Sequence, residues 1–134
     1  MIKAEKLQKR AAKSGFDWDD AKGAKDKIEE EMQEIDEVLK NHGKPLYKKI
    51  EQTEDVDMYD LLEDEIGDLL FATVNYIRLL GFSPEVALNR SNSKFKRRFS
   101  AMERLAQKKN LNFASLSLEE KDVLWEQVKV EEKK

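Results

Sequence analysis

The stretch MYDLLEDEIGDLLFATVNYIRLL, residues 58–80, decides the fold class of this 134-residue chain. Its apolar side chains recur at intervals of three and four residues, which is the period of an α-helix. One face of this helix carries Leu62, Ile66, Leu69, Thr73 and Ile77. Leu61, Leu70 and Val74 widen that face, and Gly81 ends the pattern. Such a broad apolar face predicts a central, well-buried helix.

The helical period returns on both sides of this stretch. We predict helices over residues 2–14, 21–41 and 84–108, and a last one opened by the capping-box sequence at 117–120. The row Ala24, Ile28, Met32, Ile35 and Leu39 is the apolar stripe of the second helix. Residues 43–57 and 110–116 connect helices, and no segment sustains the alternation typical of a β-strand. The sequence therefore predicts an all-α fold, a bundle of four to five helices in one domain over residues 1–134.

Composition limits the classes of function. Acidic residues exceed basic ones by 28 to 25, so we expect neither a nucleic-acid coat nor a membrane-surface binder. Cysteine is absent and His42 is the one histidine, which excludes thiolate and multi-histidine metal sites. A metal site would have oxygen ligands, which favours Mg²⁺ or Mn²⁺. The opening MIKAEKLQKR has no apolar h-region and the sequence has no run of about 18 apolar residues, so we expect a cytoplasmic protein.

Two pairs of carboxylates stand directly beside the apolar stripes. Glu31 and Glu34 flank the stripe of the second helix, and Glu65 and Asp68 flank that of the third. If these helices pack antiparallel, the four carboxylates converge at the margin of the core. Like charges brought together there need divalent cations or protons. The alternative is two solvated acidic flanks paired with Lys25, Lys27 or Lys48.

A basic segment lies within the helix that follows Pro84. Phe95 and Phe99 stand four residues apart and are expected to face the core, on a row extended by Leu88 and Met102. The cations beside that row, Lys94, Arg97 and Arg98, are suited to bind phosphate. A basic helix face that pairs with acidic neighbours explains the same pattern equally well.

Trp125 and Lys129 stand one turn apart on the last helix. A tryptophan in such a position packs into the core more often than it contacts a ligand, but its ring could stack on a base. The same two interpretations hold for Trp18. His42 lies in a turn-like sequence, and we expect it to have no chemical role.

Four motifs in chain order carry a family resemblance. They are KIEEEMQE (27–34) with LEDEIGDLLF (62–71), NSKFKRRF (92–99), WEQVK (125–129), and the opening KLQKR (6–10) with GFDW (15–18). Together they resemble the EExxE…ExxD signature, the phosphate-contacting segment, the closing motif and the opening of MazG-type nucleoside triphosphate pyrophosphohydrolases. The resemblance covers nearly the whole chain and is closest to the C-terminal, catalytically active half of two-domain MazG enzymes.

The resemblance implies Mg²⁺-dependent hydrolysis of a nucleoside triphosphate to the monophosphate and pyrophosphate, with Mn²⁺ as a substitute ion. The metal ligands that it implies are Glu31, Glu34, Glu65 and Asp68. Two carboxylates outside that set, Glu30 and Glu63, are candidates for orienting or deprotonating the attacking water. The implied nucleotide-binding residues are Lys27, Glu31, Leu61, Asp64, Asp68, Lys94, Arg97, Arg98, Trp125 and Lys129.

The resemblance also implies a homodimer in which the fourth or fifth helix of one subunit closes the site of the other. Three departures from the family pattern stand out: no N-terminal companion domain is expected, residues 43–57 are longer than the usual loop, and Asp64 replaces the common glutamate. Two alternatives stay open. One is a related pyrophosphatase acting on dUTP/dCTP or phosphoribosyl-ATP, and the other is a non-enzymatic helical dimerisation module.

Overall fold

The computed structural model describes residues 1–46, 48–50 and 56–134. Its α-helices are α1 (Ile2–Lys13), α2 (Ala21–Asn41), α3 (Val56–Leu79), α4 (Pro84–Lys108) and α5 (Leu118–Glu132). A short 3₁₀ helix, η1 (Phe113–Ser115), lies in the predicted connection before α5. The described residues contain no β-strand, so the all-α prediction is confirmed. None of their helices is long and apolar enough to cross a membrane.

The helix ends follow local sequence signals. α3 begins two residues before the predicted Met58, and the prediction for residues 43–57 lies partly outside the described residues. Ser117 and Glu120 form the predicted capping box at the start of α5, with side chains and backbone bonded reciprocally. Gly81 follows α3 with a φ of +89°, a backbone conformation that glycine adopts without the steric cost of a Cβ.

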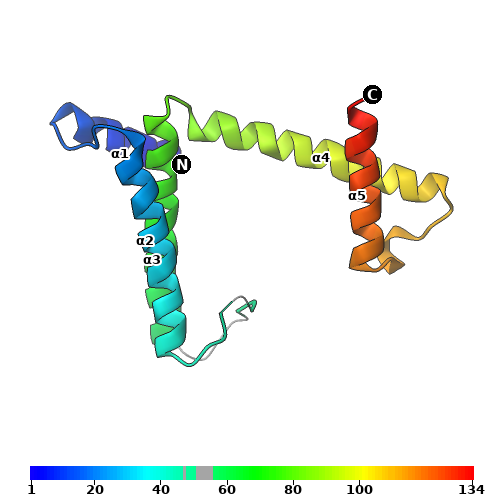
Figure 1. Ribbon diagram of the computed structural model, residues 1–134, viewed down its shortest axis with the longest axis horizontal. Coiled ribbons are helices and arrows are strands. Elements are labelled where there is room, and N and C mark those ends of the chain that lie inside the picture. Colours follow the sequence, from blue (N-terminus) through cyan, green and yellow to red (C-terminus); the bar gives the residue numbers. More distant parts are fainter. Residues whose placement is uncertain (47, 51–55) are drawn as a thin grey trace. The chain divides into compact units, whose positions relative to one another are not determined.

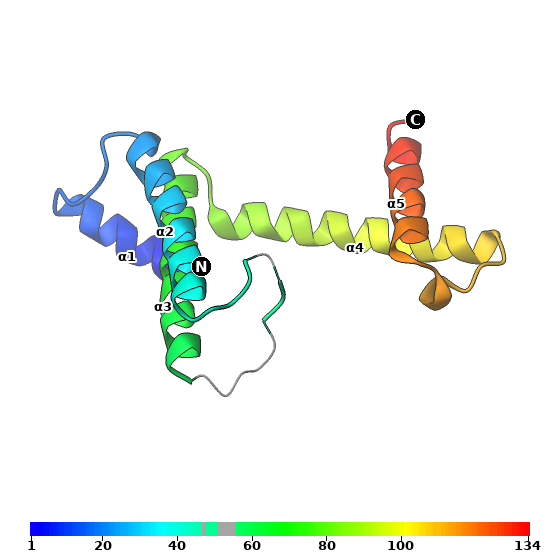
Figure 2. The same cartoon turned by 60° about the horizontal axis from the view of Figure 1, so that its bottom comes forward.

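The chain divides into two compact units, Met1–Glu85 and Val86–Lys134. In the first unit α2 and α3 pack along one another, and α1 contacts α3. Figures 1 and 2 show α2 and α3 as an antiparallel hairpin, with the chain running along α2 and returning along α3. Buried Leu39, Met58 and Leu62 form a core cluster in this hairpin. The extent of the domain within residues 1–134 remains a prediction.

The predicted core face of this hairpin is only partly right. Met32 is 54% exposed, and Ile66 is also exposed, although both belong to the predicted apolar rows. Glu31 is buried in place of its neighbour Met32. The rest of the predicted row of α2 keeps its place in the contact, since Ala24 and Leu39 are buried, so the contact face runs through Glu31 where the prediction had Met32. One neighbouring helix cannot cover the whole apolar arc of α3, so part of that arc stays exposed.

In the second unit α5 packs against α4. Their core consists of Met102, Ala106, Leu124 and Val128, with Phe113, Leu116 and Trp125 packed beside it. Phe95, Phe99 and Leu88, which we expected in the core, are exposed, whereas Met102 of the same row is buried. Both Figures 1 and 2 show α5 beside the C-terminal half of α4, so the core forms there and leaves the start of the predicted row uncovered.

Candidate functional site

The α2–α3 hairpin brings the predicted carboxylates together. Oxygen atoms of Glu31, Glu65 and Asp68 all lie within 4.8 Å of one another. A second set with the same spacing consists of Glu30, Glu31 and Glu34, so Glu31 belongs to both sets. Antiparallel packing places residues from the middle of α2 opposite residues from the middle of α3. The spacing of acids along each helix then produces one acidic cluster.

Glu31 lies deeper than the sequence indicated. We predicted carboxylates at the margin of the core, but Glu31 is only 2% exposed. Its Oε2 atom and the Oε2 atom of Glu65 are buried without a hydrogen-bond partner in the described part of the chain. A buried carboxylate oxygen without a donor is costly, because nothing replaces its lost hydration. These two oxygens therefore fit a cation, whose charge would compensate for that cost.

One cation of the chain itself reaches this cluster. The ammonium of Lys27 lies 3.0 Å from Glu31 Oε1 and 3.3 Å from Glu30 Oε1. Its hydrogen bond holds the pKa of the Glu31 carboxyl below its ordinary value, and the bonds to Glu31 and Glu30 raise the pKa of Lys27. The alternative of solvated acidic flanks predicted such a pairing with Lys27. A single ammonium does not balance this number of carboxylates.

The crowding of negative charge changes the pKa of Glu34. The neighbouring Glu65 carboxyl, followed by burial and Glu31, raises the pKa of Glu34 to about 7. Like-charged carboxylates so close together cannot all ionise at low cost, so one of them retains a proton. A bound divalent cation would remove that requirement. The donor set, carboxylate oxygens alone, suits Mg²⁺ or Mn²⁺.

The other predicted residues of this hairpin lie at its surface. Glu30 is exposed and paired with Lys27. Glu63, the second candidate for activating water, is also exposed and belongs to neither set of converging oxygens. Leu61 and Asp64 are exposed on α3, as is Asp68. Their roles in binding a nucleotide remain predictions.

Three of the four predicted basic residues of the second unit, Arg97, Arg98 and Lys129, have acidic partners within that unit. Arg98 Nε lies 3.0 Å from Glu132 Oε2, and the Arg98 guanidinium stands over the Trp125 ring at 5.6 Å. Arg97 Nε lies 3.5 Å from the other oxygen of Glu132. Lys129 lies 3.4 Å from Glu126, and Lys94 is exposed. Trp125 packs beside the core and against Phe95, as the more common interpretation of its position predicts.

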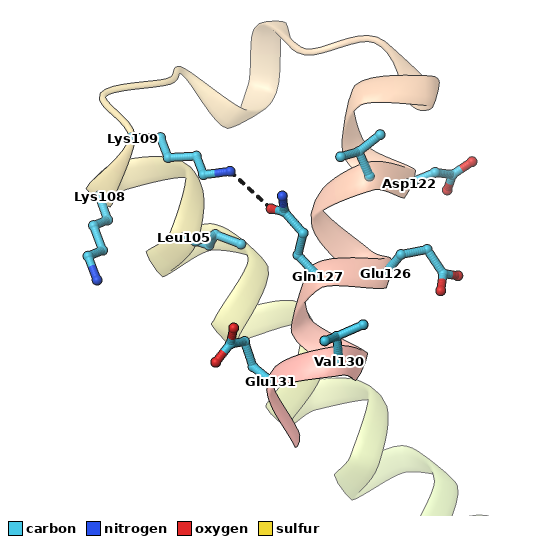
Figure 3. A pocket seen from close by; sticks show the side chains of 9 residues that line it. Leu105, Lys108, Lys109, Asp122, Glu126, Gln127, Val130 and Glu131 are labelled. Atoms are coloured by element: carbon cyan, nitrogen blue, oxygen red, sulfur yellow. Dashed lines mark hydrogen bonds between the residues drawn. The ribbon is translucent and has the colours of Figure 1, made fainter. Parts of the chain in front are cut away.

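An open groove of about 820 Å³ lies between the end of α4 and α5 (Figure 3). Lys109 donates a hydrogen bond across it to Gln127 Oε1 at 3.0 Å. Leu105 and Val130 contribute apolar surface, and the charges around them are of both signs. The groove has room for a ligand, but the sets of converging carboxylate oxygens lie in the α2–α3 hairpin and not here. We therefore place the candidate site at the α2–α3 hairpin.

Sequence analysis missed a polar network at the other end of α3. Arg78 donates to Asp17 Oδ1 at 2.7 Å and to Asn75 Oδ1 at 2.7 Å, which ties the loop after α1 to α3. The buried Gln8 amide donates to the Phe71 carbonyl at 2.8 Å. These side chains line a cavity of about 270 Å³. The one available signal was that Arg78 is the only basic residue of α3.

Comparisons with known proteins agree with the hairpin's chemistry. The sequence pattern of the MazG nucleotide pyrophosphohydrolase domain matches residues 20–102, which include α2, α3 and most of α4. A nucleoside triphosphate pyrophosphohydrolase of Escherichia coli K12 is 40% identical over 132 residues, covering 98% of this chain and 45% of that protein. A nucleoside triphosphate pyrophosphohydrolase/pyrophosphatase MazG of Thermotoga maritima is 37% identical over 126 residues, covering 94% of this chain and 42% of that protein.

The chain spans less than half the length of these two relatives. The matched region contains both acidic segments and the hairpin that brings them together. On the extent of the match and on the identity to both relatives, this chain belongs to the MazG nucleotide pyrophosphohydrolase domain family.

Proposed function

We propose that this chain hydrolyses nucleoside triphosphates, ribo or deoxy, to the monophosphate and pyrophosphate with Mg²⁺ as cofactor. The observation that carries the proposal is the convergence of carboxylates from α2 and α3 around the buried Glu31, with two buried oxygens that lack a partner among the described residues. Family membership and the names of the two relatives support the same reaction.

Glu31, Glu34, Glu65 and Asp68 are the residues that would hold the metal. When bound, a divalent cation neutralises polyphosphate charge and makes a coordinated water easier to deprotonate. Glu31 is held in place by burial and by Lys27, so its carboxylate is oriented before any ligand arrives. An oriented ligand set reduces the reorganisation needed when the substrate binds.

Water would attack the α-phosphorus, form one new P–O bond and break the bond between the α-phosphorus and the bridging oxygen. Its proton would pass to a carboxylate that holds no metal. Glu30 and Glu63 are the candidates, and both are exposed to water. Because Glu30 is paired with Lys27, it could accept a proton only with that ion pair weakened, whereas no such pair involves Glu63 within the described residues.

For the nucleotide we retain the residues that the family resemblance implies. They are Lys27, Glu31, Leu61, Asp64, Asp68, Lys94, Arg97, Arg98, Trp125 and Lys129. Arginine binds phosphate through two parallel hydrogen bonds and lysine as a point charge. Arg97 and Arg98 share Glu132 as a partner, so a phosphate must compete with that carboxylate for them.

We also propose a cytoplasmic homodimer. Four large apolar side chains of the α2–α3 hairpin are exposed, because packing between the two helices does not cover them. They are Met32, Tyr59, Ile66 and Leu70. A second copy of the hairpin would bury these side chains, and exposed apolar patches of this kind mark interfaces. Light scattering coupled to size-exclusion chromatography tests the dimer directly, and Ile66→Glu should shift the chain to a monomer.

A nucleotide panel with Mg²⁺ tests the activity. Products are resolved by ion-exchange chromatography, which separates monophosphate plus pyrophosphate from diphosphate plus phosphate. Release of pyrophosphate supports the proposal. Turnover confined to dUTP/dCTP or phosphoribosyl-ATP would assign the related pyrophosphatase instead. No turnover, together with no effect of Mg²⁺ on the melting temperature, would favour a dimerisation module without catalysis.

A further inference from the structure

The cavity beside the C-terminal part of α3 brings together two sequence motifs that the proposed function does not use. The KLQKR motif contributes Gln8, and the GFDW motif contributes residues 16–18. From α3 the cavity receives Phe71, Asn75 and Arg78, which stand on one face of the helix at spacings of four and three. None of the residues named above for the metal or the nucleotide is among those that line it.

Gln8 presents a buried hydrogen-bond acceptor at this cavity. Its side chain is 5% exposed, and its Nε2 donates to the Phe71 carbonyl at 2.8 Å, which fixes the orientation of the amide. The Oε1 atom is buried and has no hydrogen-bond partner in the described part of the chain. A buried carbonyl oxygen without a donor is costly, because nothing replaces its lost hydration. An N–H group of a ligand in the cavity would remove that cost.

The charges at the cavity balance one another. Arg78 lies 2.7 Å from Asp17 Oδ1, and these two are the charged residues that line the cavity in the described part of the chain. The hydrogen bond from Arg78 lowers the pKa of Asp17, so the pair stays ionised and has no net charge. Arg78 also donates to Asn75 Oδ1 at 2.7 Å, so Nδ2 is the Asn75 atom that would donate to a ligand. The cavity therefore offers one acceptor and one donor to a neutral molecule.

Aromatic rings supply much of the apolar wall. Phe16, Trp18 and Phe71 line the cavity, and all three are exposed, so their rings are accessible to a ligand. The Trp18 ring lies close to α2, since a Cβ on Gly23 would stand 2.6 Å from it. Aromatic rings prefer offset-stacked or edge-to-face contacts with other flat rings. The cavity of about 270 Å³ is below the range of about 300–1,000 Å³ that is typical for drug-sized ligands, so it suits a small ring system.

We propose that this cavity binds a neutral nitrogen heterocycle of the size of a nucleobase. Its N–H group donates to Gln8 Oε1, a neighbouring acceptor on the same edge receives Asn75 Nδ2, and the ring stacks on Trp18. Nucleobases carry such donors and acceptors side by side on their edges. A phosphate group does not fit this cavity, because Asp17 already neutralises Arg78.

Two sources supply a ring of this kind. One is the base of a nucleotide whose phosphates lie at the carboxylates, because Asp68 shares a face of α3 with Asn75 and stands about 10 Å from it along the helix axis. This source rests on the proposed function. The other source is a free base or nucleoside, whose binding needs neither a metal nor a phosphate.

The two tryptophans of the chain provide the test, since Trp18 lines the cavity and Trp125 belongs to the second unit. Each gives one indole N–H signal in a proton–nitrogen correlation spectrum of the full chain, and Trp125→Phe assigns the two signals. Adenosine, guanosine, cytidine, uridine and thymidine are titrated in EDTA, without nucleotide. We expect at least one of these nucleosides to shift the Trp18 signal to saturation, which gives a Kd.

Two variants alter the cavity in different ways. Gln8→Leu removes the acceptor and should weaken nucleoside binding about tenfold or more, because the N–H group of the ligand is buried without a partner. Gly23→Ala leaves the polar groups in place and favours the helix, but its methyl group displaces the Trp18 ring and should also weaken binding. Gln33→Leu, at an exposed position of α2, is the matched control and should keep the wild-type Kd. Circular dichroism verifies that each variant is folded.

A triphosphate analogue with an α,β-methylene bridge, added with Mg²⁺, distinguishes the two sources. Phosphorus resonances verify that the analogue is bound. If the bound analogue displaces the nucleoside from Trp18, the cavity holds the base of the substrate. If the nucleoside still binds, the cavity is a separate site for a free base or nucleoside.

The inference is refuted if no nucleoside shifts the Trp18 signal, if only the Trp125 signal shifts, or if Gln8→Leu and Gly23→Ala both bind as the wild type does. Hydrolysis is assayed separately on the wild type. Release of pyrophosphate without any shift of Trp18 overturns only this inference. A saturable shift of Trp18 in a chain that releases no pyrophosphate overturns only the proposed function.

Discussion

The helices of the two units differ in how their charges are balanced. α2 and α3 contain seven and six acidic residues against four and one basic residues. α4 and α5 contain two and six acidic residues against seven and two basic ones, so their charges nearly cancel. Glu132 meets two arginines, whereas Glu31 meets one lysine and four further carboxylates, two in each of its sets. The excess of negative charge around the buried Glu31 thus identifies the hairpin as the part of the described chain that fits an external cation.

Glu65→Gln tests whether the negative charge of the hairpin binds a metal. The substitution removes one charge and keeps the shape of the side chain. We expect the rate of nucleotide hydrolysis to fall about a hundredfold or more, because a metal ligand is lost. Glu37→Gln, at an exposed position of α2, is the control and should keep the wild-type rate. Turnover of Glu65→Gln at the wild-type rate would remove Glu65 from the metal site.

The effect of Mg²⁺ on the melting temperature shows which of the two units binds the cation. At a concentration about 100 times its Kd, Mg²⁺ should stabilise the chain by about 2.7 kcal/mol, because it binds the folded state. Differential scanning calorimetry with and without EDTA measures this gain as a rise in Tm. Glu132→Gln should keep the rise, and Glu65→Gln should lose most of it. An equal rise in all three proteins would place the cation outside the hairpin.

The pH dependence of the metal-free chain tests the crowding of carboxylates. Because the folded state raises the pKa of Glu34 to about 7, its contribution to stability is complete below about pH 4.5 and is lost as the pH rises to 7. Glu31 has a lowered pKa, so its contribution is lost only as the pH falls below about 4.5.

We therefore expect the urea midpoint, measured in EDTA, to decrease between pH 4.5 and 7. Glu34→Gln should flatten this decrease, because glutamine cannot ionise. Mg²⁺ should flatten it too, since a cation replaces the shared proton. A midpoint that rises over this interval in the wild type would contradict the crowding of Glu34 with Glu65.

The smallest effect is expected in the second unit. Arg98→Lys keeps the charge but loses the planar group that contacts both Glu132 and Trp125. We expect Tm to fall by about 2 °C or less, because exposed ion pairs contribute little to stability. Trp125 fluorescence should change, whereas Mn²⁺ binding should not. A fall in Tm well above 2 °C, or a change in Mn²⁺ binding, would contradict this minor role.

Much of the fold could be predicted from local signals. The periods of three and four, the capping box at Ser117 and the glycine after α3 each act within a few residues. The start of α3 at Val56 and the 3₁₀ helix near Phe113 were missed, because their short polar surroundings carry no period. Part of the connection before α3 lies outside the described residues.

The candidate site was less predictable than the helices. Its four carboxylates follow from their positions beside the apolar rows, but the burial of Glu31 and the exposure of Met32 do not. They are neighbours in one helix, and which of the two faces α3 depends on the packing of the two helices. Likewise, Phe95 belongs to an apolar row but is exposed, since α5 crosses α4 and covers only its C-terminal half.

The sequence alone determined which segments are helices and which residues lie one turn apart, because backbone geometry sets the helical period. It thereby placed Glu31 with Glu34, and Glu65 with Asp68, on single helix faces. Only the tertiary structure decided that Glu31 faces α3 and that its carboxylate meets those of Glu65 and Asp68. Helix rotation depends on packing between residues distant in sequence, and no local pattern contains that information.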